Sequence, residues 1–183
     1  MADDSPADYT EHRLTSELVY DGAMLKVRRD RVRLPDGGNA GREYVEHPGA
    51  VIIIPLLDSN TILMERQFRY AVGAHLYELP AGKIEPGEAH LLTAQREPVE
   101  ECGYTAGSWR HLATLHPCVG YSNERIELYL AEQLTHVGRE LDEGEFLDVV
   151  PMTLDEVREA LLDGRITDIK VAVGLSWLGW LAR

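Results

Sequence analysis

The stretch AGKIEPGEAHLLTAQREPVEECGY, residues 81–104, constrains this chain more than any other part of it. Its second half predicts a helix that carries three carboxylates within five residues, at Glu97, Glu100 and Glu101. Glu97 and Glu101 share one helix face, which Glu100 borders. Like charges at this spacing repel each other, so the face needs protons or a cation. Oxygen ligands alone select a hard divalent ion, and Mg²⁺ or Mn²⁺ is the expected one.

A solvated acidic face, held by pairs such as Arg96 with Glu100, is the simpler interpretation of the same run. Pro98 complicates both interpretations, because it removes the amide that would bond to the carbonyl of Ala94. We expect a kinked helix that begins near Glu88 and still binds metal. Replacing Pro98 by leucine is expected to stabilise the fold by about 1 to 3 kcal/mol, and by less if the turn has relaxed.

The spacing of the whole stretch adds a second constraint. Gly82, five residues, Glu88, seven residues and the run REPVEECGY follow the pattern G-x5-E-x7-R-E-U-x-E-E-x-G-U, where U is a bulky apolar residue. The chain is therefore similar to the Nudix hydrolases, which share this box, and the similarity extends over roughly residues 20–182. Pro98 is the box position that departs, since another apolar residue is usual there.

The resemblance assigns roles within the box. It implies metal ligands at Glu97, Glu101 and Glu100, together with the carbonyl of Ala81, which precedes the box glycine. Glu100 and Arg96 also belong to the candidate catalytic group, because Arg96 can pair with Glu100 or with the first box glutamate and hold a carboxylate in place. Two or more metal ions would then neutralise a diphosphate and activate water for attack on phosphorus.

The order of elements predicts an α/β fold with a mixed sheet. Apolar runs at 50–57 and 61–70 read as two strands joined by a hairpin, and residues 109–119 and 124–134 as two more. A capping box of Thr153 with Glu156 starts one helix, and residues 167–182 form the last. The resemblance makes this a Nudix-type α/β/α sandwich with an N-terminal β extension.

This organisation gives three segments. Residues 1–10 read as a disordered acidic tail, residues 11–46 as a β extension for dimerisation and substrate binding, and residues 47–183 as the Nudix domain. The segment 25–34 is basic, and it is either a solvated strand face or a surface for a partner or a phosphate.

Flanking runs resemble the ADP-ribose pyrophosphatase branch of the family: GREYVEHPGAV, ERQFRY, ELPAGKIEPGE, GYSNE and DEGEF. That resemblance implies substrate contacts at Arg42, Glu43 and Arg69, and Glu124 lies in a loop beside the expected site. The expected reaction is hydrolysis of a nucleoside diphosphate sugar, first of all ADP-ribose to AMP and ribose 5-phosphate.

An acidic loop supplies the remaining catalytic group. In the resembling branch a glutamate on this loop acts as base or as an extra metal ligand. The match places it at Glu143, with Glu145 close behind.

Two departures leave the substrate open. Val119 stands where such enzymes often carry proline, and Ala23 and Met24 stand where an aromatic residue often stacks on adenine. GDP-mannose and other nucleotide sugars are therefore alternative substrates, and a non-catalytic nucleotide-sugar sensor is an alternative function. Structural Ca²⁺ sites at DEGEFLD are a weaker alternative, because the loop lacks the D-x-D-x-D-G spacing.

Composition limits the partners and the compartment. A formal net charge of -13 argues against general binding to nucleic acid or to anionic membranes. The two cysteines form no C-x-x-C pair, which favours reduced thiols in the cytoplasm over a zinc site. Neither a signal peptide nor a membrane span is expected. Trp177 and Trp180 are expected in the core, and the resemblance implies a homodimer with exchanged N-terminal strands.

Overall fold

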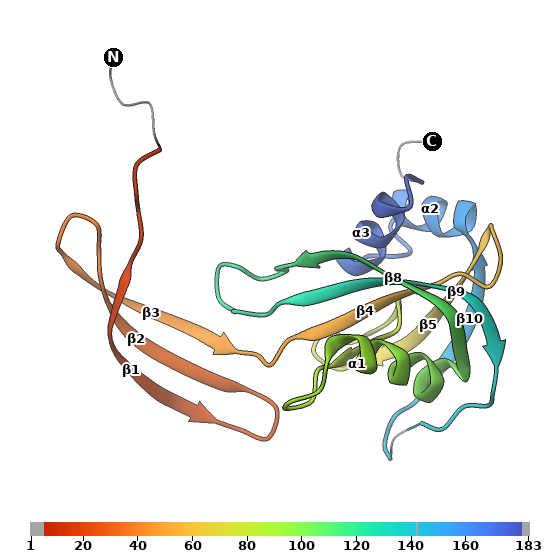
Figure 1. Cartoon of the computed structure of the whole chain (residues 1–183), viewed down its shortest axis with the longest axis horizontal. Helices are drawn as coiled ribbons and strands as arrows, with labels where there is room; N and C mark the ends of the chain where they lie inside the picture. The colour runs from red at the N-terminus through yellow and green to blue at the C-terminus, as the bar shows by residue number, and fades with distance from the viewer. Residues whose placement is uncertain (1–5, 142, 181–183) are drawn as a thin grey trace. The chain divides into compact units, whose positions relative to one another are not determined.

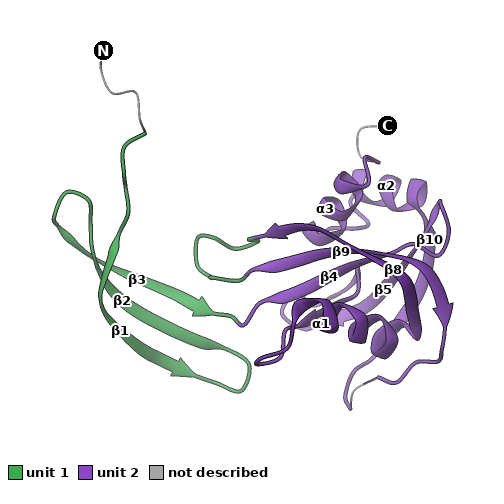
Figure 2. Ribbon diagram, in the orientation of Figure 1, with its two compact units in different colours: residues 1–47, 116–124 green, residues 48–115, 125–183 purple. Residues whose placement is uncertain are grey.

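The structure, a computed structural model, describes residues 6–141 and 143–180. The chain divides into two compact units, residues 1–47 with 116–124 and residues 48–115 with 125–183, which Figure 2 shows in different colours. Residues 1–5 of the predicted tail lie outside the described residues, and residues 6–11 have neither helix nor strand. No helix in these described ranges is long and apolar enough to cross a membrane.

The first unit contains an antiparallel sheet in the order β1-β2-β3 (Figure 1). Its strands are β1 (His12–Asp21), β2 (Lys26–Arg33) and β3 (Asn39–Glu46). Basic residues of β2 pair with acidic residues of β3: Arg28 lies 2.8 Å from Glu46, and Arg29 lies 2.9 Å from Glu43. These side chains are exposed or half-buried, which supports the interpretation of the basic segment as a solvated strand face.

The second unit contains two sheets, in the orders β7-β4-β9-β8 and β10-β5-β6. The strands are β4 (Ala50–Pro55), β5 (Thr61–Arg69), β6 (Ala74–Glu78), β7 (Ala81–Lys83), β8 (Tyr104–Leu115), β9 (Ile126–His136) and β10 (Leu147–Thr153). Strands β4 and β9 run parallel, whereas β7 and β8 are antiparallel to their neighbours. The predicted mixed sheet is therefore confirmed.

Helices cover both faces of this mixed sheet (Figure 1). The helices are α1 (His90–Glu97), α2 (Leu154–Leu162) and α3 (Ile169–Trp177). Side chains of β4 alternate between the faces: Ile52 and Ile54 belong to the core cluster of α2 and α3, whereas Val51 and Ile53 pack with Ala94 of α1. Burial of each such aliphatic side chain contributes roughly 1.5–3 kcal/mol to the stability of the fold. Because β4 contacts helices on both faces, it fixes the positions of both helical layers.

The predicted hairpin between residues 50–57 and 61–70 is wrong in its pairing. The turn exists, because the Asp58 carboxylate accepts from the amides of Asn60 and Thr61, each at 2.8 Å. Beyond an isolated bridge between Leu56 and Ile62, however, β4 and β5 belong to different sheets. Strand β5 instead pairs with β6 and β10, and β10 comes from far along the chain.

The C-terminal helices follow the sequence prediction with one exception. Thr153 and Glu156 form the expected capping box at the start of α2. Trp180 packs against the core cluster, but Trp177 is 52% exposed, so its expected place in the core is wrong.

The carboxylate helix changes its winding at Pro98. Helix α1 ends at Glu97, and a π-helical turn covers Pro98–Cys102. The turn ends at Gly103, whose backbone φ of 77° favours glycine and whose amide donates to the carbonyls of Pro98 and Val99. The expected kink thus takes the form of a wider turn. Pro98 occupies its first residue, where a missing amide costs less than inside an α-helix.

This winding revises the expected effect of Pro98→Leu. Because the turn has already relaxed around the proline, the substitution should raise stability by no more than about 1 kcal/mol. Thermal unfolding of both forms, with and without Mg²⁺, measures the change. An unchanged or lower melting temperature would show that the wide turn is built into the fold and that Pro98 is not a defect there.

Candidate active site

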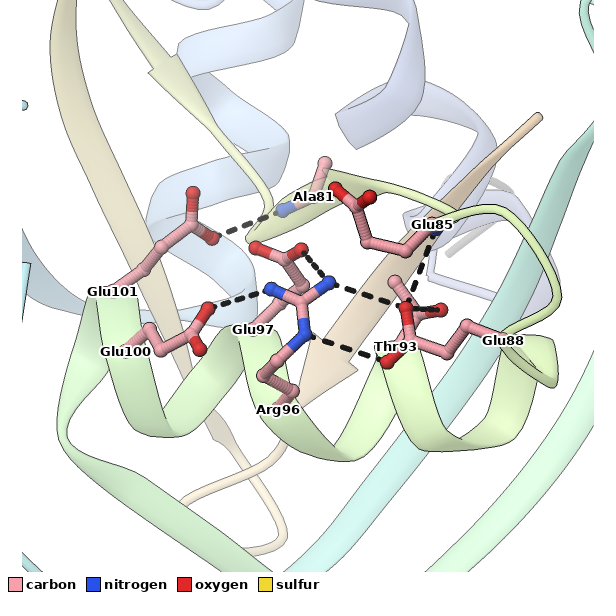
Figure 3. Close-up of polar contacts among 8 residues, drawn as sticks. All are labelled: Ala81, Glu85, Glu88, Thr93, Arg96, Glu97, Glu100 and Glu101. Carbon is pink, nitrogen blue, oxygen red and sulfur yellow. Dashed lines mark hydrogen bonds and ion pairs between the residues drawn. The ribbon is translucent and has the colours of Figure 1, made fainter. Parts of the chain in front are cut away.

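Strand β7 lies directly against the carboxylates of α1 and the π-helical turn (Figure 3). The amide of Ala81 donates to Glu101 at 3.3 Å. A Cβ placed on Gly82 would lie 1.8 Å from the carboxyl group of Glu97, so only glycine leaves room for this side chain. The box glycine therefore has a steric role, and the structure brings Ala81, Glu97 and Glu101 together as the sequence predicts.

Arg96 is the cation at the centre of this group (Figure 3). Its guanidinium lies 2.7 Å from Glu100, 3.0 Å from Glu97 and 3.4 Å from Glu88. Thr93 donates a further hydrogen bond to Glu88 at 2.8 Å. Arg96 thus makes both contacts that its position suggested, with Glu100 and with Glu88. The pairing also lowers the pKa of Glu88.

Glu65 of β5 is a member of the acidic group that the sequence analysis missed. It is buried, and the thiol of Cys102 donates to its carboxylate at 3.1 Å. Its charge is among those that raise the pKa of Glu101. The available signal was a glutamate inside the apolar run TILMERQFR, but only the pairing of distant strands brings it to α1.

Burial is the largest of the effects that disfavour the charged form of Glu65, Glu97 and Glu101. Desolvation raises the pKa of Glu97 to about 7, although the charge of Arg96 acts in the opposite direction. Desolvation together with the charges of Glu65, Glu97 and Glu145 raises the pKa of Glu101 to about 10. Desolvation also raises the pKa of Glu65 to about 7. Arg96 therefore does not compensate all of these carboxylates, and protons or added cations must do so.

The donor chemistry fits a hard divalent cation. Carboxylate oxygens of Glu97 and Glu101, with the backbone of Ala81 beside them, are the ligand type that Mg²⁺ and Mn²⁺ prefer. Within residues 6–141 and 143–180, however, no three His, Cys, Asp or Glu side chains already converge on one metal position. Glu97 and Glu100 instead contact Arg96, so binding a cation requires these side chains to exchange partners.

The predicted substrate residue Arg69 is held by another group that the sequence did not reveal. Its guanidinium forms a two-point contact with Glu78, at 2.6 and 2.9 Å, and Lys170 of α3 lies 3.0 Å from the same carboxylate. Burial alone would raise the pKa of Glu78, but the hydrogen bonds and charges of Arg69 and Lys170 lower it. Arg69 is thus fixed in orientation while nearly half of its side chain stays exposed.

Three other predicted substrate residues belong to the first unit and are described within it. Arg42 pairs with Glu11, and Glu43 pairs with Arg29. Glu124 lies 3.9 Å from the imidazole of His47. Arg42 and Glu43 also line a pocket of about 330 Å³, whose wall includes Tyr44 and Tyr121.

The acidic loop contributes one of its two candidate glutamates to the electrostatics of the carboxylate group. The charge of Glu145 raises the pKa values of Glu65, Glu97 and Glu101. Glu143 is exposed, whereas Glu145 is partly buried. Of the two candidates, Glu145 is thus the one whose charge acts on the carboxylate group, whereas the sequence placed Glu143 first.

Comparison with known families matches nearly the whole chain. Residues 46–172 match the NUDIX domain, and residues 11–45 match the N-terminal domain of nucleoside diphosphate sugar hydrolases. A crystal structure of an ADP compounds hydrolase superposes with a TM-score of 0.83 at 23% identity, covering 97% of both chains. This likeness in fold confirms the predicted sandwich with its N-terminal strands.

Curated relatives cover similar lengths. The ADP-ribose pyrophosphatase of Bacillus subtilis is 35% identical over 170 residues, which is 92% of each chain. The methanol dehydrogenase activator of Bacillus methanolicus is 36% identical over 172 residues, or 93% of each. The ADP-ribose pyrophosphatase of Mycobacterium tuberculosis is 43% identical over 134 residues, which is 73% of this chain and 65% of that protein.

The raised pKa values predict how stability depends on pH when no metal is bound. Because the folded pKa values of Glu65, Glu97 and Glu101 exceed the unfolded value of about 4.3, the folded state binds more protons above that pH. Stability should therefore fall as the pH rises from about 5 to 9. Melting temperatures in EDTA should show this fall, and millimolar Mg²⁺ should reduce it. In the Glu101→Gln variant, the dependence of the melting temperature on pH in EDTA should be flatter. A dependence as steep as that of the unchanged protein would contradict the assignment of a raised pKa to Glu101.

Proposed function

This chain belongs to the Nudix hydrolase family, and on that premise we propose that it splits the diphosphate bond of a nucleoside diphosphate sugar. ADP-ribose is the first candidate, with AMP and ribose 5-phosphate as products. The observation that carries the proposal is the acidic group of α1, the π-helical turn and β5, where the buried carboxylates Glu97, Glu101 and Glu65 outnumber the cation Arg96. The match of residues 11–45 and the names of two relatives support the substrate class.

Metal binding is assigned to the box residues. Glu97 and Glu101 hold the cation, with Glu100 and the carbonyl of Ala81 as further ligands, and Mg²⁺ is the expected ion. When bound, divalent cations neutralise the diphosphate and lower the pKa of a coordinated water molecule. Arg96 keeps Glu88 in place, and its contacts with Glu97 and Glu100 are the ones that a bound cation would replace.

Glu145 is assigned as the residue that orients or deprotonates the attacking water. Its charge acts on the same carboxylates that are assigned to the cation, which supports this role. Glu143 stays the alternative on the same loop. A carboxylate in this role contributes typically 10²–10⁴-fold to the rate as a general base.

Substrate positioning is assigned to Arg42, Glu43, Arg69 and Glu124. Glu78 already fixes the guanidinium of Arg69, so less side-chain entropy is lost when the substrate binds. Tyr121 is 62% exposed beside Arg42 and Glu43 and can stack on a base, in place of the aromatic residue that is missing at Ala23 and Met24.

A homodimer in the cytoplasm completes the proposal. Every residue of β1 is exposed, including Leu14, Leu18 and Val19, and an exposed edge strand with apolar side chains favours association with a second copy. The N-terminal extension, residues 11–46, would then serve both dimerisation and substrate binding. Both cysteines, Cys102 and Cys118, are free thiols, which suits a reducing compartment.

A substrate panel tests the proposed reaction. We expect Mg²⁺-dependent hydrolysis of ADP-ribose in preference to GDP-mannose, UDP-glucose, NADH and FAD, with AMP and ribose 5-phosphate identified by chromatography. Glu101→Gln should lower kcat by roughly 10²-fold or more, because it removes a metal ligand while the fold persists. Full activity in excess chelator would contradict the metal assignment. Binding of a nucleotide sugar without any cleavage would instead show the non-catalytic sensor.

A comparison of two conservative variants tests the base. Glu145→Gln should reduce kcat by roughly 10²–10⁴-fold and change KM much less, because it removes a proton acceptor and leaves the substrate contacts. Glu143→Gln is the matched control on the same loop and should retain most of the activity. If Glu143→Gln proves the more damaging change, the base moves by two residues; if neither matters, it lies elsewhere.

A further inference from the structure

A second pocket lies away from the carboxylates, on the sheet β10-β5-β6. Its volume is about 320 Å³, within the range of small-ligand sites, and its walls include Arg66, Phe68, His75, Arg139, Phe146 and Asp148. Arg66 and Phe68 alternate along β5 with Glu65, so they face the opposite side of the sheet from the acidic group. The pocket therefore lies on the opposite face of this sheet from Glu65, although its loop residues Leu141 and Phe146 flank Glu145.

The aromatic side chains of this pocket are unusually placed. The chain contains two phenylalanines, and both line the pocket, with Phe68 49% exposed and Phe146 82% exposed. The ring of Phe68 also contacts the imidazole of His75 edge to face, with 5.2 Å between the centroids. Apolar rings held at the surface around a hollow can stack on a planar ligand.

The charge of the pocket also differs from that of the chain. In a protein with a net charge of -13, this pocket has two arginines and a single acidic residue, Asp148, among its lining residues. Arg66 lies 3.6 Å from Asp148, a long contact between exposed groups. Arg139 donates one bond to the carbonyl of Leu147 at 3.1 Å, which uses one of its five N–H groups. Donors of Arg139 thus remain for an anion in this pocket.

We propose that this pocket binds a nucleoside 5′-monophosphate. The base would stack on Phe68 and Phe146, and the phosphate would contact Arg66 and Arg139, which suit its planar two-point recognition. Residues that line the pocket flank Glu145 along the chain, with Leu141 before it and Phe146 after it, so its ligand would contact the segment that carries this glutamate. The binding itself does not depend on the proposed reaction.

Calorimetric titration with AMP tests the site. The protein is the Glu101→Gln variant in EDTA, which removes metal-dependent binding at the carboxylates. We expect AMP to bind. Adenosine lacks the phosphate and ribose 5-phosphate lacks the base, so the Kd of each should be at least about tenfold higher than that of AMP. Phe146→Ala and Arg66→Ala should each raise the Kd for AMP about tenfold or more.

Arg165→Ala is the matched control, since Arg165 is an exposed arginine that pairs with Asp163 outside this pocket. It should leave the Kd for AMP unchanged, and circular dichroism checks that each variant folds. No measurable binding of AMP, or binding that ignores both pocket variants, overturns the proposal. A change of oligomeric state in Phe146→Ala, without any binding of AMP, would also overturn it. The ring would then pack against a second copy of the chain.

Discussion

The structure depends on keeping several carboxylates close together and away from water. Glu97, Glu101 and Glu65 are buried, and Arg96 is the cation that contacts Glu97. Burial and mutual repulsion raise their pKa values, which means that the folded chain holds them at a cost. Buried carboxylates with raised pKa values are typical of functional sites, where a bound ligand supplies the positive charge that the protein lacks. This requirement for positive charge links the fold to its chemistry.

The surrounding fold is able to hold this group because β4 is buried on both faces. Ile52 and Ile54 anchor the layer of α2 and α3, while Val51 and Ile53 anchor α1. The helix cannot move away from β7 to relieve the repulsion without exposing this core. Gly82 then sets the closest approach, because any side chain there would overlap the carboxyl group of Glu97.

Local patterns in the sequence predicted local structure well. The box spacing placed Glu97 and Glu101 against Ala81, and the i,i+4 rule gave the pair of Arg96 with Glu100. The failures are non-local. The apolar runs around β4 and β5 look like one hairpin, and only the arrival of β10 separates them into two sheets. Glu65 contacts Cys102, and Glu78 contacts Lys170 as well as Arg69. Cys102 and Lys170 come from distant parts of the chain, so no short pattern could reveal both roles in full.

The arginines assigned to the site are already paired, and this constrains how an acidic protein can bind a diphosphate. Arg96 contacts Glu97 and Glu100, Arg69 is held by Glu78, and Arg42 pairs with Glu11. Each of these arginines already has at least one carboxylate partner, so these side chains offer direction and hydrogen bonds more than net positive charge. In the proposed mechanism, the attraction for the diphosphate comes from cations held at Glu97 and Glu101. Metal binding and substrate binding would then be coupled, because each supplies the charge that the other lacks.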